Sequence, residues 1–132
     1  MSGETQLTVL LRTLSPERQP GEYVYATLPT LPTLPADIDA AMAFREHEGW
    51  TLVLRREVAE AAGLDFTFPC AWLTLRVHSS LQAVGLTAAV ADALADAGIA
   101  CNAVAAYHHD HLFVPLDRAD EAIEILRRLS RS

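Results

Sequence analysis

Ligand-type side chains are densest at His108-His109-Asp110-His111, where imidazole and carboxylate groups could bind a metal ion or take part in catalysis. In a strand, alternate side chains face opposite ways, so His109 and His111 would separate from His108 and Asp110. Four adjacent strand residues cannot converge on one ion, whereas a tight turn could bring two or three together, with His78 nearby. We interpret the cluster as a hairpin turn with surface histidines and predict no metal site. A metal-binding protein or enzyme built on these residues is the alternative.

The segment 79–86, SSLQAVGL, joins a predicted strand to a predicted helix. It places hydroxyls and a glycine where the first backbone N–H groups of the helix lack partners and the helix dipole is positive. Such a site favours an anion, for example a carboxylate. Alternatively, Ser79 and Gln82 form a capping box, S-x-x-Q, that needs no ligand. Spacing alone favours the capping box without excluding binding.

Two further residues with chemical potential fall in the apolar segment 99–106. Cys101 has no basic residue close to it in sequence, so we interpret it as a buried, inert thiol. Asn102 must satisfy its amide group in apolar surroundings, either with neighbouring backbone or with a ligand. Both alternatives stay open for Asn102.

Hydrophobic periodicity predicts the elements that position these residues. The bulky, β-branched run 72–77 predicts a strand, and helical spacing of apolar residues over 84–97 predicts a helix. Gly98 can adopt the left-handed conformation that ends a helix. The segment 99–107 then predicts a strand, the histidine segment a turn into another strand, and 117–129 a last helix. The second half therefore has the order β, α, β, β, α.

The first half contains a comparable set of elements. Apolar spacing predicts a short helix at 7–14, a strand at 23–28, a hairpin at 42–54 and a helix at 57–62. Three consecutive copies of Thr-Leu-Pro over 27–35 predict an extended connector, and 37–41 predicts one helical turn. The linker 65–69 is short, so we expect the two halves to share a core.

Composition limits the kind of protein. With 132 residues, 51% of them hydrophobic, the chain can bury a core without disulfides. A net charge of −7 disfavours nucleic acid and anionic membrane as partners. The two cysteines lie among apolar neighbours, and the N-terminus lacks the pattern of a signal peptide. We therefore expect a cytoplasmic protein with no nucleic-acid or membrane partner.

This pattern of elements, with HSSLQAVGLTAAV, GIACN and YHHDHLFVP in succession, resembles the ACT domain family. The similarity is greatest to small stand-alone proteins with two ACT-like halves and to regulatory ACT domains of amino-acid kinases. Motifs carry it over residues 71–130, and the first half matches only in architecture. The resemblance implies an α+β, ferredoxin-like βαββαβ sandwich with helices on one face of antiparallel sheets. It also implies an ACT-like half at 1–70 and an ACT domain at 71–132.

The resemblance further implies a non-catalytic regulatory sensor of a small molecule, most often an amino acid, that needs no cofactor. In the family the ligand lies between the loop after the first strand and the start of the second strand, often across a subunit or domain interface. Carried over to this chain, the ligand-binding positions are Ser79, Ser80, Val84, Gly85, Leu86, Ile99, Cys101 and Asn102. Loop amides would hold a carboxylate, and Asn102 would hold the rest of the ligand.

No fourth strand follows the last helix, so we expect the first half or a partner chain to supply it. We also expect a homodimer or higher homo-oligomer. A module that only assembles with other chains through an open sheet edge is a third interpretation.

Overall fold

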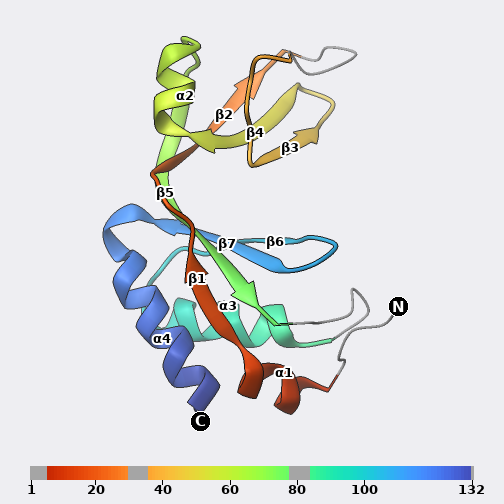
Figure 1. The fold of residues 1–132 in the computed structure, drawn as a ribbon, viewed down its shortest axis with the longest axis vertical. Helices are drawn as coiled ribbons and strands as arrows, with labels where there is room; N and C mark the ends of the chain where they lie inside the picture. Colours follow the sequence, from red (N-terminus) through yellow and green to blue (C-terminus); the bar gives the residue numbers. More distant parts are fainter. Residues whose placement is uncertain (1–5, 30–35, 78–83, 132) are drawn as a thin grey trace. The chain divides into compact units, whose positions relative to one another are not determined.

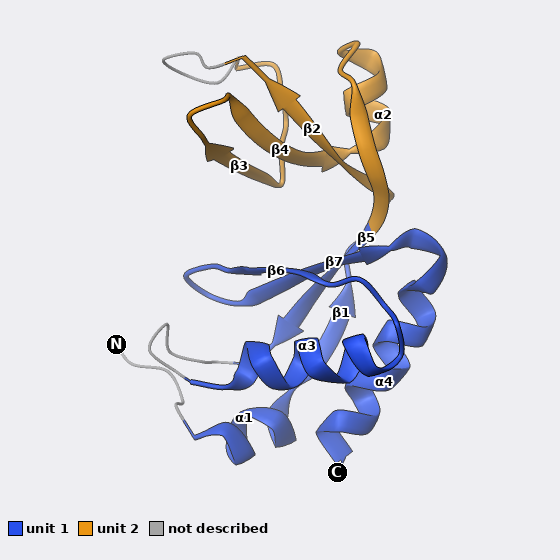
Figure 2. Cartoon of the chain, turned by 180° about the vertical axis from the view of Figure 1, so that it is seen from behind, with its two compact units in different colours: residues 1–20, 71–132 blue, residues 21–70 orange. Residues whose placement is uncertain are grey.

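The computed structural model describes residues 6–29, 36–77 and 84–131 and divides the chain into two compact units (Figures 1 and 2). Unit 1 comprises residues 1–20 and 71–132, and unit 2 comprises residues 21–70. Unit 1 contains α1 (Leu7–Thr13), β1 (Ser15–Arg18), α3 (Leu86–Asp96), β6 (Asn102–Ala105), β7 (Asp110–Pro115), a 3₁₀ turn η1 (Leu116–Arg118) and α4 (Ala119–Arg131). Unit 2 contains β2 (Tyr23–Leu28), β3 (Met42–Arg45), β4 (Trp50–Arg55) and α2 (Arg56–Ala61). β5 (Phe66–Arg76) begins in unit 2 and continues in unit 1.

Unit 1 is a sheet with helices on one face. β5 neighbours both β1 and β7, and β6 lies beyond β7 at the edge. Alternate strand residues, among them Leu73, Leu75 and Val114, share a buried hydrophobic cluster with Val90 of α3 and Leu126 of α4. The intervening side chains of these strands therefore point to the opposite, helix-free face.

β1 completes the sheet of unit 1 by taking the position of its fourth strand. Residues 15–18 pair antiparallel with residues 73–76 of β5, and Leu10 of the preceding α1 is fully buried in the unit 1 cluster. The resulting order β1-β5-β7-β6 is that of a ferredoxin-like unit whose last strand comes from the N-terminus. The expectation that the first half provides this strand is confirmed. For the same reason residues 1–20 group with 71–132, whereas the sequence grouped them with residues up to 70.

Unit 2 has a related plan with the strand order β3-β4-β2-β5. Its pairs are antiparallel, and Ala59 of α2 is buried in a cluster with Val24, Leu52 and Leu54. The predicted helical turn at 37–41 is wrong, because these residues are not helical and Ile38 packs against the cluster instead. The expected α+β fold with antiparallel sheets and helices on one face is confirmed.

The junction between the halves differs from its prediction. Residues 66–69 are not a linker but the first part of β5, which contains a one-residue register shift opposite Tyr23 and Tyr25. Phe68 adopts a positive φ of 58° there, as a bulged strand can require. The expectation of one shared core is also wrong, since the buried residues that the structure describes form two separate clusters.

The helices that cover unit 1 follow the predicted pattern. α3 buries Leu86, Val90 and Leu94, and Gly98 follows it with a left-handed φ of 71°, as expected. α4 carries acidic residues in its first turn and arginines in its last turn, which suits the helix dipole. In the described parts of the chain, no helix is both long and apolar enough to cross a membrane.

Candidate functional site

The described part of the predicted binding loop begins at Val84. Ser79 and Ser80 lie outside the described residues. Val84 is 82% exposed, and Gly85 precedes α3 as its N-cap with a φ of 98°. Only glycine adopts such a φ readily, because it has no Cβ.

The start of α3 bears on the two interpretations of this loop. A capping box formed by Ser79 and Gln82 requires the helix to begin beside Ser79, but α3 begins at Leu86. Ser79 and Gln82 lie outside the described residues, so the capping box stays a prediction. Because Gly85 has no side chain to cap the helix, the first-turn N–H groups of α3 gain no partner from the N-cap residue.

α1 forms one wall beside this helix start. A Cβ placed on Gly85 would lie 3.3 Å from Cδ2 of Leu7. Leu7 also packs against the unit 1 cluster, so α1 is anchored next to the N-terminus of α3 (Figure 2). α1 therefore packs against unit 1 at this point.

The remaining predicted site residues have different environments. Leu86 and Ile99 are each 3% exposed and belong to the unit 1 cluster, so their side chains serve the core. Cys101 is half-buried, and burial raises the pKa of its thiol, which fits the prediction of an unreactive cysteine. Asn102 is exposed at the start of β6 opposite Phe113.

Gly85 and Asn102 do not converge within one chain. Gly85 precedes the first residue of α3, whereas Asn102 starts β6 after the helix has ended. An 11-residue helix is about 16 Å long. In Figure 2, β6 begins beyond the end of α3 and runs back towards the side on which α3 starts. Within one unit, the tip of the β6–β7 hairpin rather than Asn102 lies on the side of Gly85.

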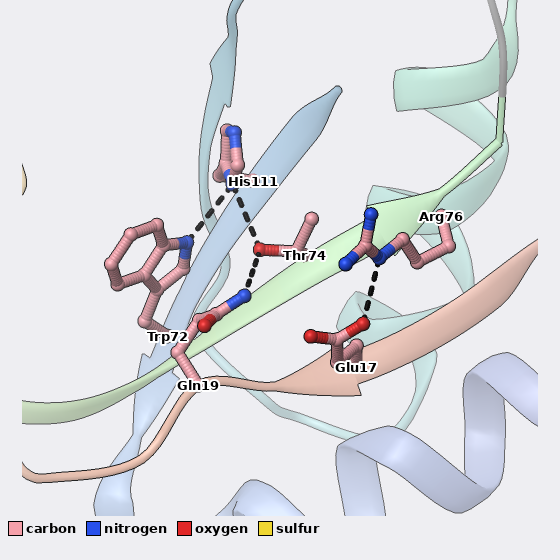
Figure 3. Close-up of polar contacts among 6 residues, drawn as sticks. All are labelled: Glu17, Gln19, Trp72, Thr74, Arg76 and His111. Atoms are coloured by element: carbon pink, nitrogen blue, oxygen red, sulfur yellow. Dashed lines mark hydrogen bonds and ion pairs between the residues drawn. The ribbon is translucent and has the colours of Figure 1, made fainter. Parts of the chain in front are cut away.

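A polar network lies on the helix-free face of the unit 1 sheet (Figure 3). Trp72 Nε1–H donates to Nδ1 of His111 at 2.9 Å, and the Thr74 hydroxyl lies 3.1 Å from the same nitrogen. Gln19 Nε2 donates to Thr74 Oγ1 at 2.9 Å. Thr74 is only 3% exposed, so this network satisfies a polar group that is buried between strands.

The network fixes the state of His111. An indole nitrogen can only donate, so Nδ1 of His111 is an acceptor and the ring proton is on Nε2. Burial, and secondly the neighbouring His109, lower the pKa of His111. His111 is therefore a neutral ring joined to β5 by hydrogen bonds, not a free metal ligand.

The rest of the histidine segment is spread over the hairpin. His109 lies beside His111 with ring centroids 6.4 Å apart, whereas His108 lies against Tyr107 at 5.0 Å. Nδ1 of His109 is buried and has no hydrogen-bond partner among the described residues, and burial raises the pKa of the Asp110 carboxyl. No group of three or more His, Cys, Asp or Glu residues within 6–29, 36–77 and 84–131 could hold a metal ion. His78 lies outside these ranges.

An ion pair continues the helix-free face towards the end of β5. Arg76 Nε donates to Glu17 Oε2 at 2.7 Å across the β1–β5 pair (Figure 3). This contact lowers the pKa of the Glu17 carboxyl and raises that of the Arg76 guanidinium.

Sequence reasoning missed both this pair and the Trp72–Thr74–His111 network. The period-two alternation of Trp72, Thr74 and Arg76 within an apolar run was the available signal.

Comparisons with known proteins agree over residues 2–128. Residues 2–71 match one family model described as an ACT domain, and residues 67–128 match a second model with the same description. A comparison with curated protein sequences gives no match.

Three solved structures illustrate the similarity. A Vibrio cholerae protein of unknown function, described as a possible transport protein, is 42% identical with a TM-score of 0.86, over 94% of this chain and 95% of its own. A protein from Agrobacterium tumefaciens is 17% identical with a TM-score of 0.75, over 89% of each chain. The regulatory subunit of aspartate kinase from Thermus flavus is 11% identical with a TM-score of 0.63, over 87% of this chain and 96% of its own. The latter two show a shared fold.

Proposed function

The chain belongs to the ACT domain family, and on this basis we propose that it is a non-catalytic regulatory protein that binds a small molecule, an amino acid. Family membership and the likeness to a regulatory subunit of aspartate kinase support a regulatory ligand-binding role. Burial raises the pKa of both Cys70 and Cys101, so neither thiol is activated as a nucleophile.

The observation that carries the proposal is that α3 begins at Leu86 after the N-cap residue Gly85, which makes no side-chain hydrogen bond to the helix. A helix N-terminus with uncapped N–H groups favours an anion, and the carboxylate of an amino acid fits this requirement. The loop residues Ser79 and Ser80 and the backbone at Val84 to Leu86 would surround the carboxylate.

A second copy of the chain would lie beside this site. β6 lies at the edge of the sheet, and its residues Asn102–Ala105 carry no charge and no proline, so the edge is not protected against pairing. If two β6 strands paired antiparallel, Asn102 of the partner subunit would lie beside Ala105, at the hairpin end of the sheet. That is the end on which α3 starts, so the partner subunit would lie beside the ligand at Gly85, with the Asn102 side chain on the helix-free face because Asn102 pairs with Phe113. We therefore propose a homodimer or higher homo-oligomer.

Isothermal titration against the twenty common amino acids tests the proposal. We expect one of them to release or absorb heat with saturation, and at least ten-fold weaker binding in Gly85→Trp. Gly63→Trp is the matched control, because Gly63 also has a positive φ and a Cβ there meets nothing within 4 Å. A folded protein that binds no amino acid would contradict the proposal.

Oligomer size separates the assembly-only interpretation from ligand binding. If Gly85→Trp abolishes binding but leaves the mass in light scattering unchanged, a purely structural module is excluded. Metal analysis of protein purified without a tag tests the remaining alternative, since a resident site at His108–His111 would retain near-stoichiometric metal.

A further inference from the structure

A shallow groove of about 380 Å³ lies on unit 2, and none of its residues belongs to the loop before α3. This volume falls within the range of small-molecule sites, roughly 300–1,000 Å³. The groove crosses the end of β2, the start of β4 and the start of β5. Its lining residues are Tyr25, Ala26, Thr27, Thr51, Asp65, Phe66 and Thr67.

Strand register gathers the hydroxyl groups of this groove on one face. Thr27 pairs with Thr51, and Tyr25 pairs with Thr67. These residues alternate with Val24, Ala26, Leu52 and Leu54 of the unit 2 cluster, so they point away from α2. Four hydroxyl side chains from three adjacent strands therefore share the face opposite to the helix.

Charge in the groove has one sign. Asp65 is exposed and makes no hydrogen bond or ion pair with another described residue, and no basic residue lines the groove. The nearby Glu46 carboxylate accepts the hydroxyl proton of Thr51, so the oxygen of Thr51 keeps only its acceptor capacity. The Asp65 carboxylate would repel an anionic ligand. A neutral ligand would form no ion pair with this carboxylate.

We propose that this groove binds a small primary alkylammonium ion. The ammonium group carries three donors and no acceptor, which matches the Asp65 carboxylate and the threonine oxygens. The alkyl chain would lie along the ring of Tyr25, and a cation beside an aromatic ring gains further attraction. The net charge of −7 raises the local concentration of such a cation. This site is independent of the proposed amino-acid site in unit 1.

Titration of the ¹⁵N-labelled chain with n-butylammonium chloride, followed by amide chemical shifts, tests the proposal. We expect saturable shifts at Thr27, Thr51 and Thr67. n-Butanol and n-butyrate at the same concentrations and ionic strength should bind at least five-fold more weakly. If n-butanol binds equally well, the groove is an apolar or hydroxyl-binding site, and the ammonium proposal is wrong.

Asp65→Asn removes the counter-charge without changing the size of the side chain. We expect about five-fold weaker binding of n-butylammonium, the typical effect of losing an exposed ion pair. Asp92→Asn is the control, because Asp92 is exposed on α3 and the net charge changes equally. The proposal is overturned if the shifts do not saturate, or if the two variants bind alike.

Discussion

The indole N–H of Trp72 and Nδ1 of His111, 2.9 Å apart, join β5 to β7 on the helix-free face of unit 1. The two rings also meet edge to face, with centroids 5.6 Å apart. Thr74 and Gln19 extend the contact, so side chains link β5 and β7 to the residue that follows β1. This network ties the N-terminal strand to the C-terminal domain that it completes.

His111 should make stability depend on pH. Its pKa is lowered from 6.5 by burial, so below about pH 6.5 the unfolded chain binds a proton that the folded protein still excludes. The unfolded state then holds more protons, and the free energy of unfolding falls as the pH falls, by at most about 1.4 kcal/mol per pH unit for one proton. Urea denaturation at pH 7.5, 6.5 and 5.5 measures this fall.

His111→Gln should remove this part of the pH dependence, whereas His108→Gln should keep it, since His108 is exposed on the hairpin. Equal pH slopes in wild type and His111→Gln would show that His111 does not carry the effect.

Thr74→Val should lower the free energy of unfolding by about 1–2 kcal/mol, because a nearly isosteric side chain removes the hydroxyl that serves Gln19 and His111. In a Gln19→Leu background the same substitution should cost at least about 0.5 kcal/mol less, as expected for coupled partners. Urea denaturation of the four proteins gives the coupling energy. Additive effects would mean that the Gln19–Thr74 contact contributes nothing to stability.

Gly85→Ala should destabilise more than Gly63→Ala. Both residues have a positive φ, which costs a residue with a Cβ about 1–2 kcal/mol. At Gly85 the new Cβ would also lie 3.3 Å from Leu7, whereas at Gly63 it meets nothing within 4 Å. Thermal unfolding of the two variants compares the costs, and equal losses would show that α1 yields freely at this position.

Cys70 should resist alkylation in the folded protein. It is fully buried, its thiol donates to the carbonyl of Tyr23 at 3.4 Å, and burial raises its pKa to about 12. Iodoacetamide at pH 8 should leave Cys70 unmodified in buffer and label it in urea, as peptide mass spectrometry would show. Labelling in buffer at the rate seen in urea would contradict the buried position.

Local patterns predicted the elements that depend on local physics. The strand predicted at 23–28 is β2 with the same bounds, and the helix after the loop ends before Gly98 as expected. These predictions succeed because strand alternation, helical spacing and the left-handed preference of glycine act over a few residues. The ACT resemblance of the second half rests on the same local order of elements and is confirmed.

Interactions between distant residues decided what the sequence left open or predicted wrongly. β1 completes unit 1 because residues 15–18 pair with residues 73–76, which no local pattern indicates. The separation of Gly85 from Asn102, and the meeting of Trp72 with His111, likewise follow from how the strands are ordered in the sheet. The sequence by itself determined the family, the element types and the candidate loop. Only the tertiary structure decided which strands are neighbours, because pairing depends on backbone hydrogen bonds and burial across the whole chain.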